Sequence, residues 1–402
     1  MSVRVAAALS VLVASLVAAG STPAHGGAPD LAGELERALA APGIAPELTA
    51  ALAVDLETGR VVYEQHAEAA LLPASAEKLA VSFAALRALG PRFRFQTALL
   101  GSGEQVARQW RGDLYLVGYG DPTLALPDLD LLARRLAARG IRRVTGRLLG
   151  DERHFDAKRA APGWKPTFLG RESRPLSALS VAGASQPGPN GSAAAAARAM
   201  TVALARHGIR VAGGSSTGRA PDDAAHLARD VSEPLSAIAR RMNTDSDNFV
   251  AEMVLKELGA TVTGRGSTAA GARVVRRALA DADVPVAGVR IADGSGLSAH
   301  DRLTAAALVA ILEAGSEDPA VERVFVGSLA VAGRSGTLER RLERRPTRNR
   351  VRAKTGTTRR ASALAGFVGT RYAFAILQNG RPVPYWGARA AQDRFVTILA
   401  RP

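Results

Sequence analysis

The sequence predicts a mixed α/β protein with more than one domain. Its 402 residues exceed the length of one ordinary domain. Hydrophobic residues make up 47% and charged residues 22%, a composition typical of a folded chain with a sizeable core. Aromatic residues contribute only 4%, so Ala, Val and Leu must fill this core. Such a core favours layers of helix and sheet over an aromatic-rich sandwich.

The first 26 residues are expected to be a secretory signal peptide. Arg4 precedes a short apolar run over residues 5–19, and small residues follow it. The run is shorter than the about 20 apolar residues needed to span a bilayer. No later stretch is free of charge for that length. This pattern predicts cleavage and export to the periplasm or the extracellular cell wall, with no stable membrane span; a retained anchor is the alternative.

Composition excludes several classes of chemistry. Cysteine is absent, which removes disulfide frameworks, thiolate metal sites and cysteine nucleophiles. The six histidines form no metal-binding pattern, and no phosphate-binding Gly-x-x-x-x-Gly-Lys loop occurs, so neither a metal nor an organic cofactor is expected. The formal net charge is +15, and almost all of the positively charged residues are arginines, which is typical of a GC-rich genome. Nucleic acid is therefore not the expected partner.

The first elements of the mature chain are a hairpin and a helix. Short apolar strands over residues 48–54 and 60–64 flank the turn Glu57-Thr-Gly59. A helix is predicted over residues 75–89, because apolar residues recur on one face and Gly90-Pro91 ends the pattern.

The remaining elements alternate between strand and helix. Strands are predicted at 112–117 and 143–149, helices at 126–139 and 193–207, and a loop at 185–192. Residues 232–282 are rich in helix. A second hairpin joins 361–368 to 372–378, and a helix over 387–400 closes the chain. No repeat of fixed period occurs, which argues against a solenoid.

The first motif that carries chemistry is Ser75-Ala-Glu-Lys78. On a helix, side chains three positions apart share one face, so the Ser75 hydroxyl and the Lys78 amine can form a hydrogen bond. A lysine in a desolvated, cation-rich pocket favours its free amine and can accept the serine proton. Alone, such a pattern is more often a helix cap followed by a solvated lysine.

The second motif is Ser246-Asp247-Asn248, at the start of a helix predicted over residues 249–258 and ended by Gly259. Ser246 and Asn248 can direct a proton relay and an amide donor to the same side. The alternative is simple capping, for which Ser, Asp and Asn are all preferred.

The third motif is Lys354-Thr355-Gly356-Thr357, before the apolar strand that starts at Ala361. A strand edge there offers backbone N–H groups, a cation and hydroxyls to a substrate carboxylate. Gly356 permits close approach.

In this order, the three motifs form the signature of the penicillin-recognising serine acyl-transferases. Two of only five lysines occupy its two lysine positions. More of the chain resembles one family in that group, the D-alanyl-D-alanine carboxypeptidase/endopeptidases, or class C low-molecular-mass penicillin-binding proteins. The resemblance extends through Leu72-Pro-Ala-Ser-Ala-Glu-Lys-Leu79, Gly90-Pro-Arg-Phe-Arg-Phe95, Gly120-Asp-Pro-Thr-Leu124, Pro162-Gly-Trp164, Met242-Asn-Thr-Asp-Ser-Asp-Asn248, Ala292-Asp-Gly-Ser-Gly-Leu-Ser298, Gly336-Thr-Leu338 and Ala363-Leu-Ala-Gly-Phe367.

The resemblance implies a fold and a division into domains. The catalytic part is expected to be a serine β-lactamase-like transpeptidase domain with an antiparallel sheet and a helical subdomain. The long separation of Ser75 from Ser246 implies an inserted, smaller α/β domain, which the resemblance locates at residues 95–225. The catalytic domain is then discontinuous, formed by residues 27–94 and 226–402.

The resemblance also implies an activity on peptidoglycan peptides, with β-lactam antibiotics as inhibitors. Ser75 attacks the bond between two D-Ala units, and Lys78 takes its proton. Ser246 and Lys354 pass a proton to the leaving amine, and Asn248 holds the substrate amide. Lys354 and Thr355 bind the terminal carboxylate, with Gly356 beside them, and the N–H groups of Ser75 and Thr357 form the oxyanion hole. Arg341 is expected near the substrate.

One departure from the family follows the Pro-Gly-Trp turn. Characterised members place an acidic residue shortly after it, which contacts the amino end of the stem peptide. Here no carboxylate occurs between Trp164 and Glu172, so this specificity contact is not predicted.

Two alternatives and two weaker patterns remain. A β-lactamase or esterase on the same scaffold is disfavoured because no Glu-x-x-Leu-Asn deacylation motif occurs, and a non-catalytic wall-binding protein because all three motifs are intact. Gly214-Ser-Ser-Thr-Gly218 fits a nucleophile elbow but is expected in a polar loop. The arginines between Arg334 and Arg359 form either a solvated surface or an attraction for the anionic wall. The oligomeric state is not predicted.

Overall fold

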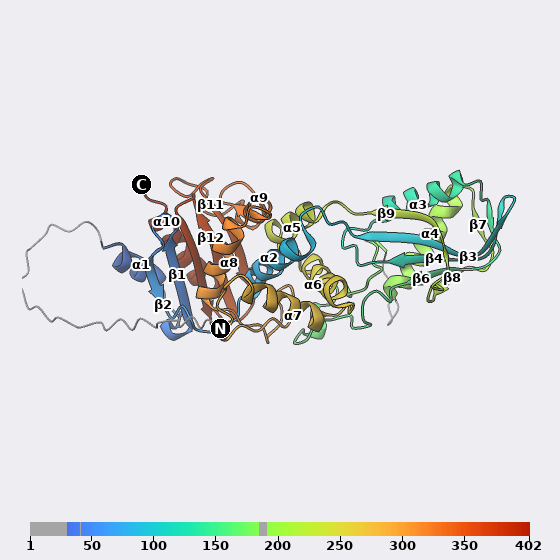
Figure 1. The fold of residues 1–402 in the computed structure, drawn as a ribbon. Helices are drawn as coiled ribbons and strands as arrows, with labels where there is room; N and C mark the ends of the chain where they lie inside the picture. The colour runs from blue at the N-terminus through green and yellow to red at the C-terminus, as the bar shows by residue number, and fades with distance from the viewer. Residues whose placement is uncertain (1–29, 41, 185–190) are drawn as a thin grey trace, which may run out of the picture. The chain divides into compact units, whose positions relative to one another are not determined.

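Two β-sheets organise the computed structural model, which describes residues 30–40, 42–184 and 191–402 (Figure 1). The expected signal peptide and most of the loop expected at 185–192 lie outside the described residues. Residues 31–402 form one unit by their contacts. Helices and sheets are mixed, and one sheet is antiparallel, so the predicted fold class is confirmed.

The first sheet is antiparallel and joins the two ends of the chain, with the strand order β10-β11-β12-β13-β1-β2. Its strands are β1 (Thr49–Asp55), β2 (Arg60–Gln65), β10 (Ala330–Val331), β11 (Val351–Thr357), β12 (Ala361–Val368) and β13 (Tyr372–Asn379). Both predicted hairpins, β1–β2 and β12–β13, are confirmed. β1 pairs with β13 along its whole length, which ties the first hairpin to the last.

Helices cover both faces of this sheet (Figure 1). The covering helices are α1 (Leu31–Leu39) and α10 (Tyr385–Leu399) on one face and α8 (Ala305–Glu317) on the other. Along β13, Phe374 and Ile376 join the core beneath α1 and α10, whereas Ala373 and Ala375 join the core on the α8 side. Because both faces are buried, β12 and β13 are continuous apolar runs rather than alternating ones.

More helices pack on the α8 side and complete the larger core. They are α2 (Glu77–Leu89), α5 (Leu235–Thr244), α6 (Asn248–Thr263), α7 (Thr268–Ala280) and α9 (Glu322–Gly327). The sequence predicts that Gly259 ends α6, but the helix continues to Thr263 and Gly264 ends it with φ 70°. A Cβ on Gly259 would come within 2.8 Å of the Gly271 nitrogen on α7. Gly259 therefore allows α6 and α7 to pack closely.

The second sheet is mixed and lies within residues 96–231. Its strands are β3 (Gln96–Val106), β4 (Gln109–Gly118), β5 (Arg143–Val144), β6 (Leu148–Asp151), β7 (Arg210–Val211), β8 (Ser215–Thr217) and β9 (Ala225–Val231). The order is β7-β5-β4-β3-β9, with β6 between β4 and β8. Two helices, α3 (Leu126–Ala138) and α4 (Gly191–Arg206), supply the apolar side chains of its main core.

The second sheet differs from expectation in three places. The strand predicted over 143–149 is two strands, because Gly146 turns the chain and its N–H donates to the Gly112 carbonyl. The segment 215–217 is the short strand β8 rather than a polar loop. β9 pairs with β3, so this sheet extends to Val231, beyond the expected end of the insertion at residue 225.

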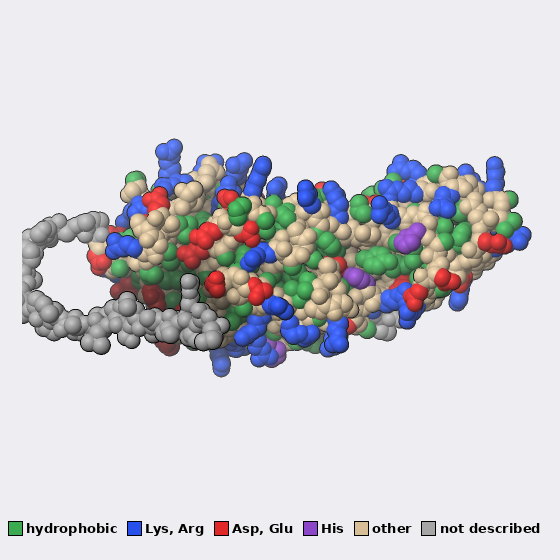
Figure 2. All heavy atoms as spheres, viewed as in Figure 1, with side chains coloured by type: hydrophobic (Ala, Val, Ile, Leu, Met, Phe, Trp, Pro, Cys, Tyr) green, Lys and Arg blue, Asp and Glu red, His purple; other side chains and the backbone are tan. Residues whose placement is uncertain are grey.

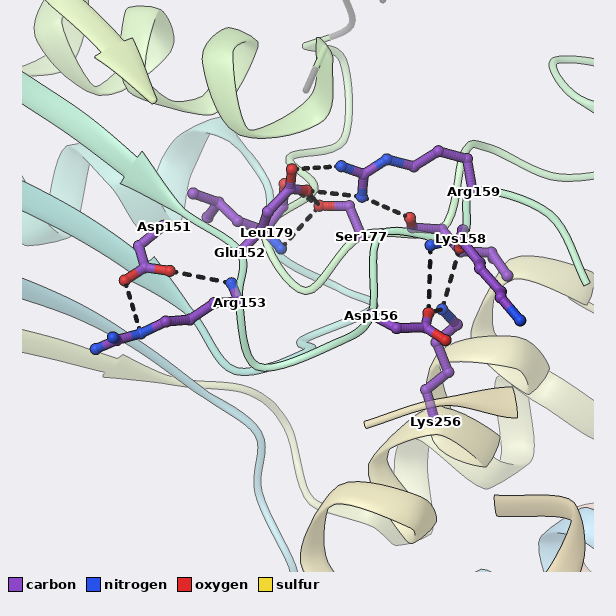
Figure 3. A network of polar contacts seen from close by, with 10 residues as sticks. Asp151, Glu152, Arg153, Asp156, Lys158, Arg159, Ser177, Leu179 and Lys256 are labelled. Atoms are coloured by element: carbon purple, nitrogen blue, oxygen red, sulfur yellow. Dashed lines mark hydrogen bonds and ion pairs between the residues drawn. The ribbon is translucent and has the colours of Figure 1, made fainter. Parts of the chain in front are cut away.

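The segment that follows β6 carries polar contacts to α6 (Figure 3). Lys256 Nζ on α6 donates to Asp156 Oδ1 at 2.5 Å and to the Lys158 carbonyl at 3.1 Å. A backbone bridge between Phe155 and Gly266 adds a second connection. These contacts fix the segment against α6, the helix that begins with the second motif.

Of the helices in the described part of the chain, none is both long and apolar enough to cross a bilayer.

Candidate active site

Ser75 lies in a tight turn at the start of α2. The turn is the 3-10 helix η2 (Ala74–Ala76), so the α-helix begins at Glu77, two residues later than predicted. Ala74 has φ 47°, a strained conformation for a residue other than glycine. Gly296 packs on this turn, since a Cβ there would come within 1.8 Å of the Ala74 carbonyl oxygen. The loop that contains Gly296 therefore supports the turn that presents Ser75.

Lys78 is completely buried and makes three hydrogen bonds through Nζ. The distances are 3.0 Å to Ser75 Oγ, 2.8 Å to Asn248 Oδ1 and 2.7 Å to the Ser295 carbonyl oxygen. A neutral amine has two hydrogens and one lone pair. In that neutral form the two carbonyl oxygens, which can only accept, take the two hydrogens, and the lone pair is left for the Ser75 hydroxyl. The geometry matches an amine that accepts the serine proton.

The surroundings of Lys78 favour that neutral form. Burial lowers the pKa of Lys78 to about 8, although the carboxylates of Asp293 and Glu252 act in the opposite direction. In the described part of the chain no carboxylate lies within ion-pair distance of Nζ, and the three direct partners are uncharged. Desolvation therefore outweighs the more distant acids.

Buried acids hold the loop that contacts Lys78. Glu252 Oε1 on α6 accepts from the Gly294 and Ser295 N–H groups, both at 2.9 Å. Asp293 Oδ1 accepts from the Ser295 N–H at 3.1 Å and the Gly296 N–H at 2.7 Å. Burial and the nearby Asp293 charge raise the pKa of Glu252 to about 8. These bonds fix the Ser295 carbonyl that accepts from Lys78.

Ser246 and Lys354 form a second pair. Lys354 Nζ donates to Ser246 Oγ and to the Thr355 carbonyl, both at 2.9 Å, and the lysine is completely buried. Burial holds the pKa of Lys354 well below its ordinary value, and the charge of Lys78 adds to the effect. Ser246 has φ 61°, a left-handed conformation that a non-glycine residue seldom adopts. The backbone is thus bent where the Ser246 hydroxyl reaches the lysine.

The capping of α6 falls to Asp247 alone. Its Oδ1 accepts from the Val250 N–H at 3.0 Å. Asn248 instead uses both ends of its amide: Oδ1 accepts from Lys78, and Nδ2 donates to the Glu172 carbonyl at 3.0 Å. Simple capping therefore does not account for Ser246 and Asn248, which face the lysines.

The third motif occupies the end of β11, where β10 no longer pairs with the strand. Thr355 Oγ1 donates to Thr337 Oγ1 at 2.8 Å. A Cβ on Gly356 would come within 2.7 Å of the Pro73 carbonyl, so glycine lets this edge approach the Ser75 turn. Thr357 is exposed at the end of the strand. The edge offers hydroxyls and N–H groups beside the nucleophile.

The structure does not bring Arg341 to these residues. Its Nε donates to Asp393 Oδ1 at 2.6 Å, and Nη2 donates to Gln392 Oε1 at 2.9 Å. Both partners lie on α10, so the guanidinium is committed to the helix behind the first sheet.

Residues from the segment after β6 reach the same centre. Trp164 Nε1 donates to Asp293 Oδ2 at 2.7 Å, and the Glu172 backbone accepts from Asn248. The Glu172 side chain is exposed. Asp151, by contrast, is buried and bound to the Ala220 N–H, away from these contacts.

Four residues of the centre were given no role by the sequence: Glu252, Asp293, Ser295 and Thr337. The last three belong to stretches that carry the family resemblance, but no spacing rule connects them with Lys78 or Thr355. Glu252 lies among apolar residues of α6, and an acid in such surroundings is the available signal. Across residues 30–40, 42–184 and 191–402, no group of three or more His, Asp or Glu side chains could hold a metal ion.

Comparisons with known proteins identify the family of this chain. The sequence profile described as "D-Ala-D-Ala carboxypeptidase 3 (S13) family" matches residues 31–186 and 189–401. A D-alanyl-D-alanine carboxypeptidase from Actinomadura sp. is 31% identical over 99% of this chain and 90% of its own length. Carboxypeptidase DacB of Mycolicibacterium smegmatis is 31% identical over 89% of this chain and 84% of its own.

Among solved structures, penicillin binding protein 4 from Haemophilus influenzae superposes with a TM-score of 0.81. It covers 92% of this chain and 98% of its own at 23% identity, a likeness that shows the fold. The same protein has also been solved with a bound β-lactam, with a TM-score of 0.72 to this chain.

Proposed function

The chain belongs to the D-Ala-D-Ala carboxypeptidase 3 (S13) family, and from this premise we propose that it cleaves the D-Ala-D-Ala end, or the cross-link, of peptidoglycan peptides through an acyl-enzyme on Ser75. It is a serine DD-carboxypeptidase, a hydrolase that acts outside the cytoplasm at the cell wall. The observation that carries the proposal is the set of Lys78 hydrogen bonds, which leave one lone pair for the Ser75 hydroxyl.

Acylation begins when Ser75 Oγ attacks the carbonyl carbon of the penultimate D-Ala. Its proton moves to Lys78 Nζ, which burial keeps poised for the transfer. The oxyanion develops beside the Ser75 turn and the end of β11, where the N–H groups of Ser75 and Thr357 stabilise it. Gly356 makes this arrangement possible, because β11 approaches the turn at that residue.

The leaving D-Ala amine needs a proton. Ser246 supplies it from its hydroxyl and recovers one from Lys354, to which it is hydrogen-bonded at 2.9 Å. The terminal carboxylate of the substrate lies against Lys354 and Thr355. An anion there favours the charged form of Lys354, so binding of the substrate prepares the lysine as the proton donor.

Asn248 contributes to both parts of the centre. Its Oδ1 holds the Lys78 amine, and its Nδ2 lies beside the substrate backbone, where the Glu172 carbonyl now accepts from it. Water then hydrolyses the acyl ester and restores the Ser75 hydroxyl.

We also propose a division into two domains, which the two sheets support. The catalytic domain comprises the first sheet and its helices, from both ends of the chain. Because β9 pairs with β3, we place the inserted domain at residues 95–231.

Labelling with penicillin tests the proposal. Intact-protein mass spectrometry should show one acyl group per chain, mapped to the Ser75 peptide, and none in Ser75→Ala. Thermal unfolding of Ser75→Ala confirms that the fold persists. Labelling that survives this substitution would overturn the assignment of the nucleophile. Release of D-Ala from a pentapeptide then separates a peptidase from a β-lactamase or esterase.

A further inference from the structure

A cavity lies against α10, and none of its lining residues belongs to the Ser75 centre. It has a volume of about 560 Å³, and its walls come from the segment 340–347 and from α10. Its main lining residues are Arg340, Arg341, Arg344, Arg345, Trp386 and Arg389. Figure 2 shows Lys and Arg side chains gathered along the edge of the molecule where α10, β11 and α9 lie.

The cavity carries an excess of positive charge. Five arginines line it, against the acids Glu343 and Asp393. Asp393 is already engaged by Arg341. Within the described residues, no carboxylate forms an ion pair with Arg340, Arg344 or Arg345, whose side chains are exposed. Guanidinium groups gathered without counter-ions favour an anionic ligand.

Among the residues that line the cavity, Arg341 has one guanidinium nitrogen for which the described residues supply no hydrogen-bond partner. Arg341 is only 6% exposed, and its Nε and Nη2 are bound by Asp393 and Gln392. Nη1 has no hydrogen-bond partner among the described residues. Arg341 lines the cavity, so this guanidinium can offer Nη1 to a ligand without giving up its bonds to Asp393 and Gln392. A fixed, buried guanidinium donates with little loss of conformational freedom.

The rim of the cavity carries an exposed aromatic ring. Trp386, in the first turn of α10, is 74% exposed, and its ring forms a T-shaped pair with the ring of Tyr385, with centroids 4.7 Å apart. An exposed indole beside a polar cavity is typical of a binding surface. Its apolar face suits the C–H face of a sugar ring, whereas its position beside the arginines suits a sugar that carries a negative group.

We propose that this cavity binds an anionic saccharide unit of the cell wall, with its carboxylate or phosphate on the arginines and its sugar ring on Trp386. Arg340 lies three residues after Thr337, which contacts Thr355 in the Ser75 centre. A polymer held in the cavity stays bound to the enzyme, which raises the effective concentration of its peptides at the Ser75 centre. The cavity raises activity on polymeric wall without touching the reacting groups. Only this effect on activity rests on the proposed function; the binding itself does not.

Direct binding tests the proposal independently of catalysis. The probes are a glycosylated glycerol-phosphate oligomer for the phosphate source, a disaccharide-peptide of peptidoglycan for the carboxylate source, and single-stranded DNA of equal charge. We expect one of the two saccharide probes to bind in calorimetry, more tightly than DNA. Failure of both saccharide probes, or equal binding of DNA, would overturn the proposal in favour of a non-specific basic surface.

Variants locate the binding. Arg340→Glu with Arg344→Glu should weaken the bound saccharide probe by roughly 10- to 100-fold, since charge-assisted hydrogen bonds are lost. Trp386→Ala should weaken it by about tenfold and leave DNA binding unchanged. The matched control, Arg108→Glu with Arg111→Glu, makes the same change in charge on the exposed β3–β4 hairpin and should change affinity less than threefold, roughly as expected for screened surface charges. Equal losses in the pair and its control would overturn the site.

Two measurements separate this proposal from the proposed function. Penicillin labelling and D-Ala release from a small peptide should be unchanged in Arg340→Glu with Arg344→Glu, whereas release from insoluble wall should fall. The milder pair Arg340→Gln with Arg344→Gln, which removes charge without reversing it, repeats the test if the first pair unfolds. Unchanged activity on insoluble wall, in a variant that no longer binds the probe, would contradict a role in turnover on the polymer.

Discussion

Two lysines on neighbouring parts of the helical core are both completely buried, yet their surroundings differ. Lys256 donates to the Asp156 carboxylate at 2.5 Å, whereas the hydrogen-bond partners of Lys78 are all uncharged oxygens. Burial lowers the pKa of both. At Lys256 the hydrogen bond to Asp156 opposes the shift directly, and at Lys78 the opposing acids are farther away. Lys256, which is buried with an ion pair, therefore has a structural role, whereas Lys78, which is buried without one, can act as a base.

The same segment of the chain reaches both lysines. Asp156 pairs with Lys256, and Trp164 donates to Asp293, which supports the loop that contacts Lys78. The segment after β6 therefore contributes to stability at one point and to the geometry of the active centre at another. Each of the following changes acts on one side of this comparison.

The largest effect is expected at Lys78. Lys78→Arg keeps a cation but cannot accept a proton, so the second-order rate of acylation by penicillin should fall about 10²- to 10⁴-fold. Lys256→Arg preserves the ion pair and should retain most of the rate. Mass spectrometry of timed samples measures both. Similar losses in the two variants would mean that charge, rather than proton transfer, is what Lys78 supplies.

The pH dependence of acylation sharpens the difference. Because burial lowers the pKa of Lys78 to about 8, the free amine is lost as the pH falls below that value. The acylation rate should drop by about tenfold per pH unit between pH 8 and 6, and level off above pH 8. Lys256→Arg should show the same profile. A rate that is flat down to pH 6 would contradict an amine base with this pKa.

The sequence predicts the reacting groups better than their support. Ser75, Lys78, Ser246, Asn248 and Lys354 are identified by local motifs, and the structure places their side chains in two hydrogen-bonded groups. That placement leaves their roles as proposals. The motifs work because nucleophile and base lie within one turn of the chain, and the other groups lie at the ends of elements.

The supporting contacts are long-range, and no local pattern encodes them. The Ser295 carbonyl reaches Lys78 from 217 positions away. The sequence predicts that Gly259 ends a helix. In the structure Gly259 lies inside α6, where the absence of a side chain lets α7 approach. For Arg341 the sequence predicts a place near the substrate, but the side chain instead binds Asp393 and Gln392 on α10. Only the position of α10 in the fold reveals these partners.

A moderate effect is expected at Trp164. Trp164→Phe keeps an aromatic ring at this position but removes the indole N–H that donates to Asp293 Oδ2. The loop that contacts Lys78 is then less firmly held. The acylation rate constant at saturating penicillin should fall by about tenfold, while the dissociation constant of the initial complex stays nearly unchanged. Trp386→Phe, in an exposed tryptophan outside this centre, is the control. A change confined to the dissociation constant would show that Trp164 contacts the ligand instead.

The smallest effect on catalysis is expected at the structural lysine. Asp156→Asn leaves Lys256 buried without its counter-ion, which should lower the free energy of unfolding by about 1–3 kcal/mol; the full cost of breaking a buried pair is reduced because the Asp156 side chain is 32% exposed. Acylation by penicillin should change less than about twofold, since Lys78 and its partners are untouched. Chemical denaturation measures the stability. Lys256→Met removes the charge that needs a partner, so Asp156→Asn should cost much less in that background. If the two costs are equal, the pair contributes nothing as a pair, and Lys256 is stabilised by the Lys158 carbonyl and its packing alone.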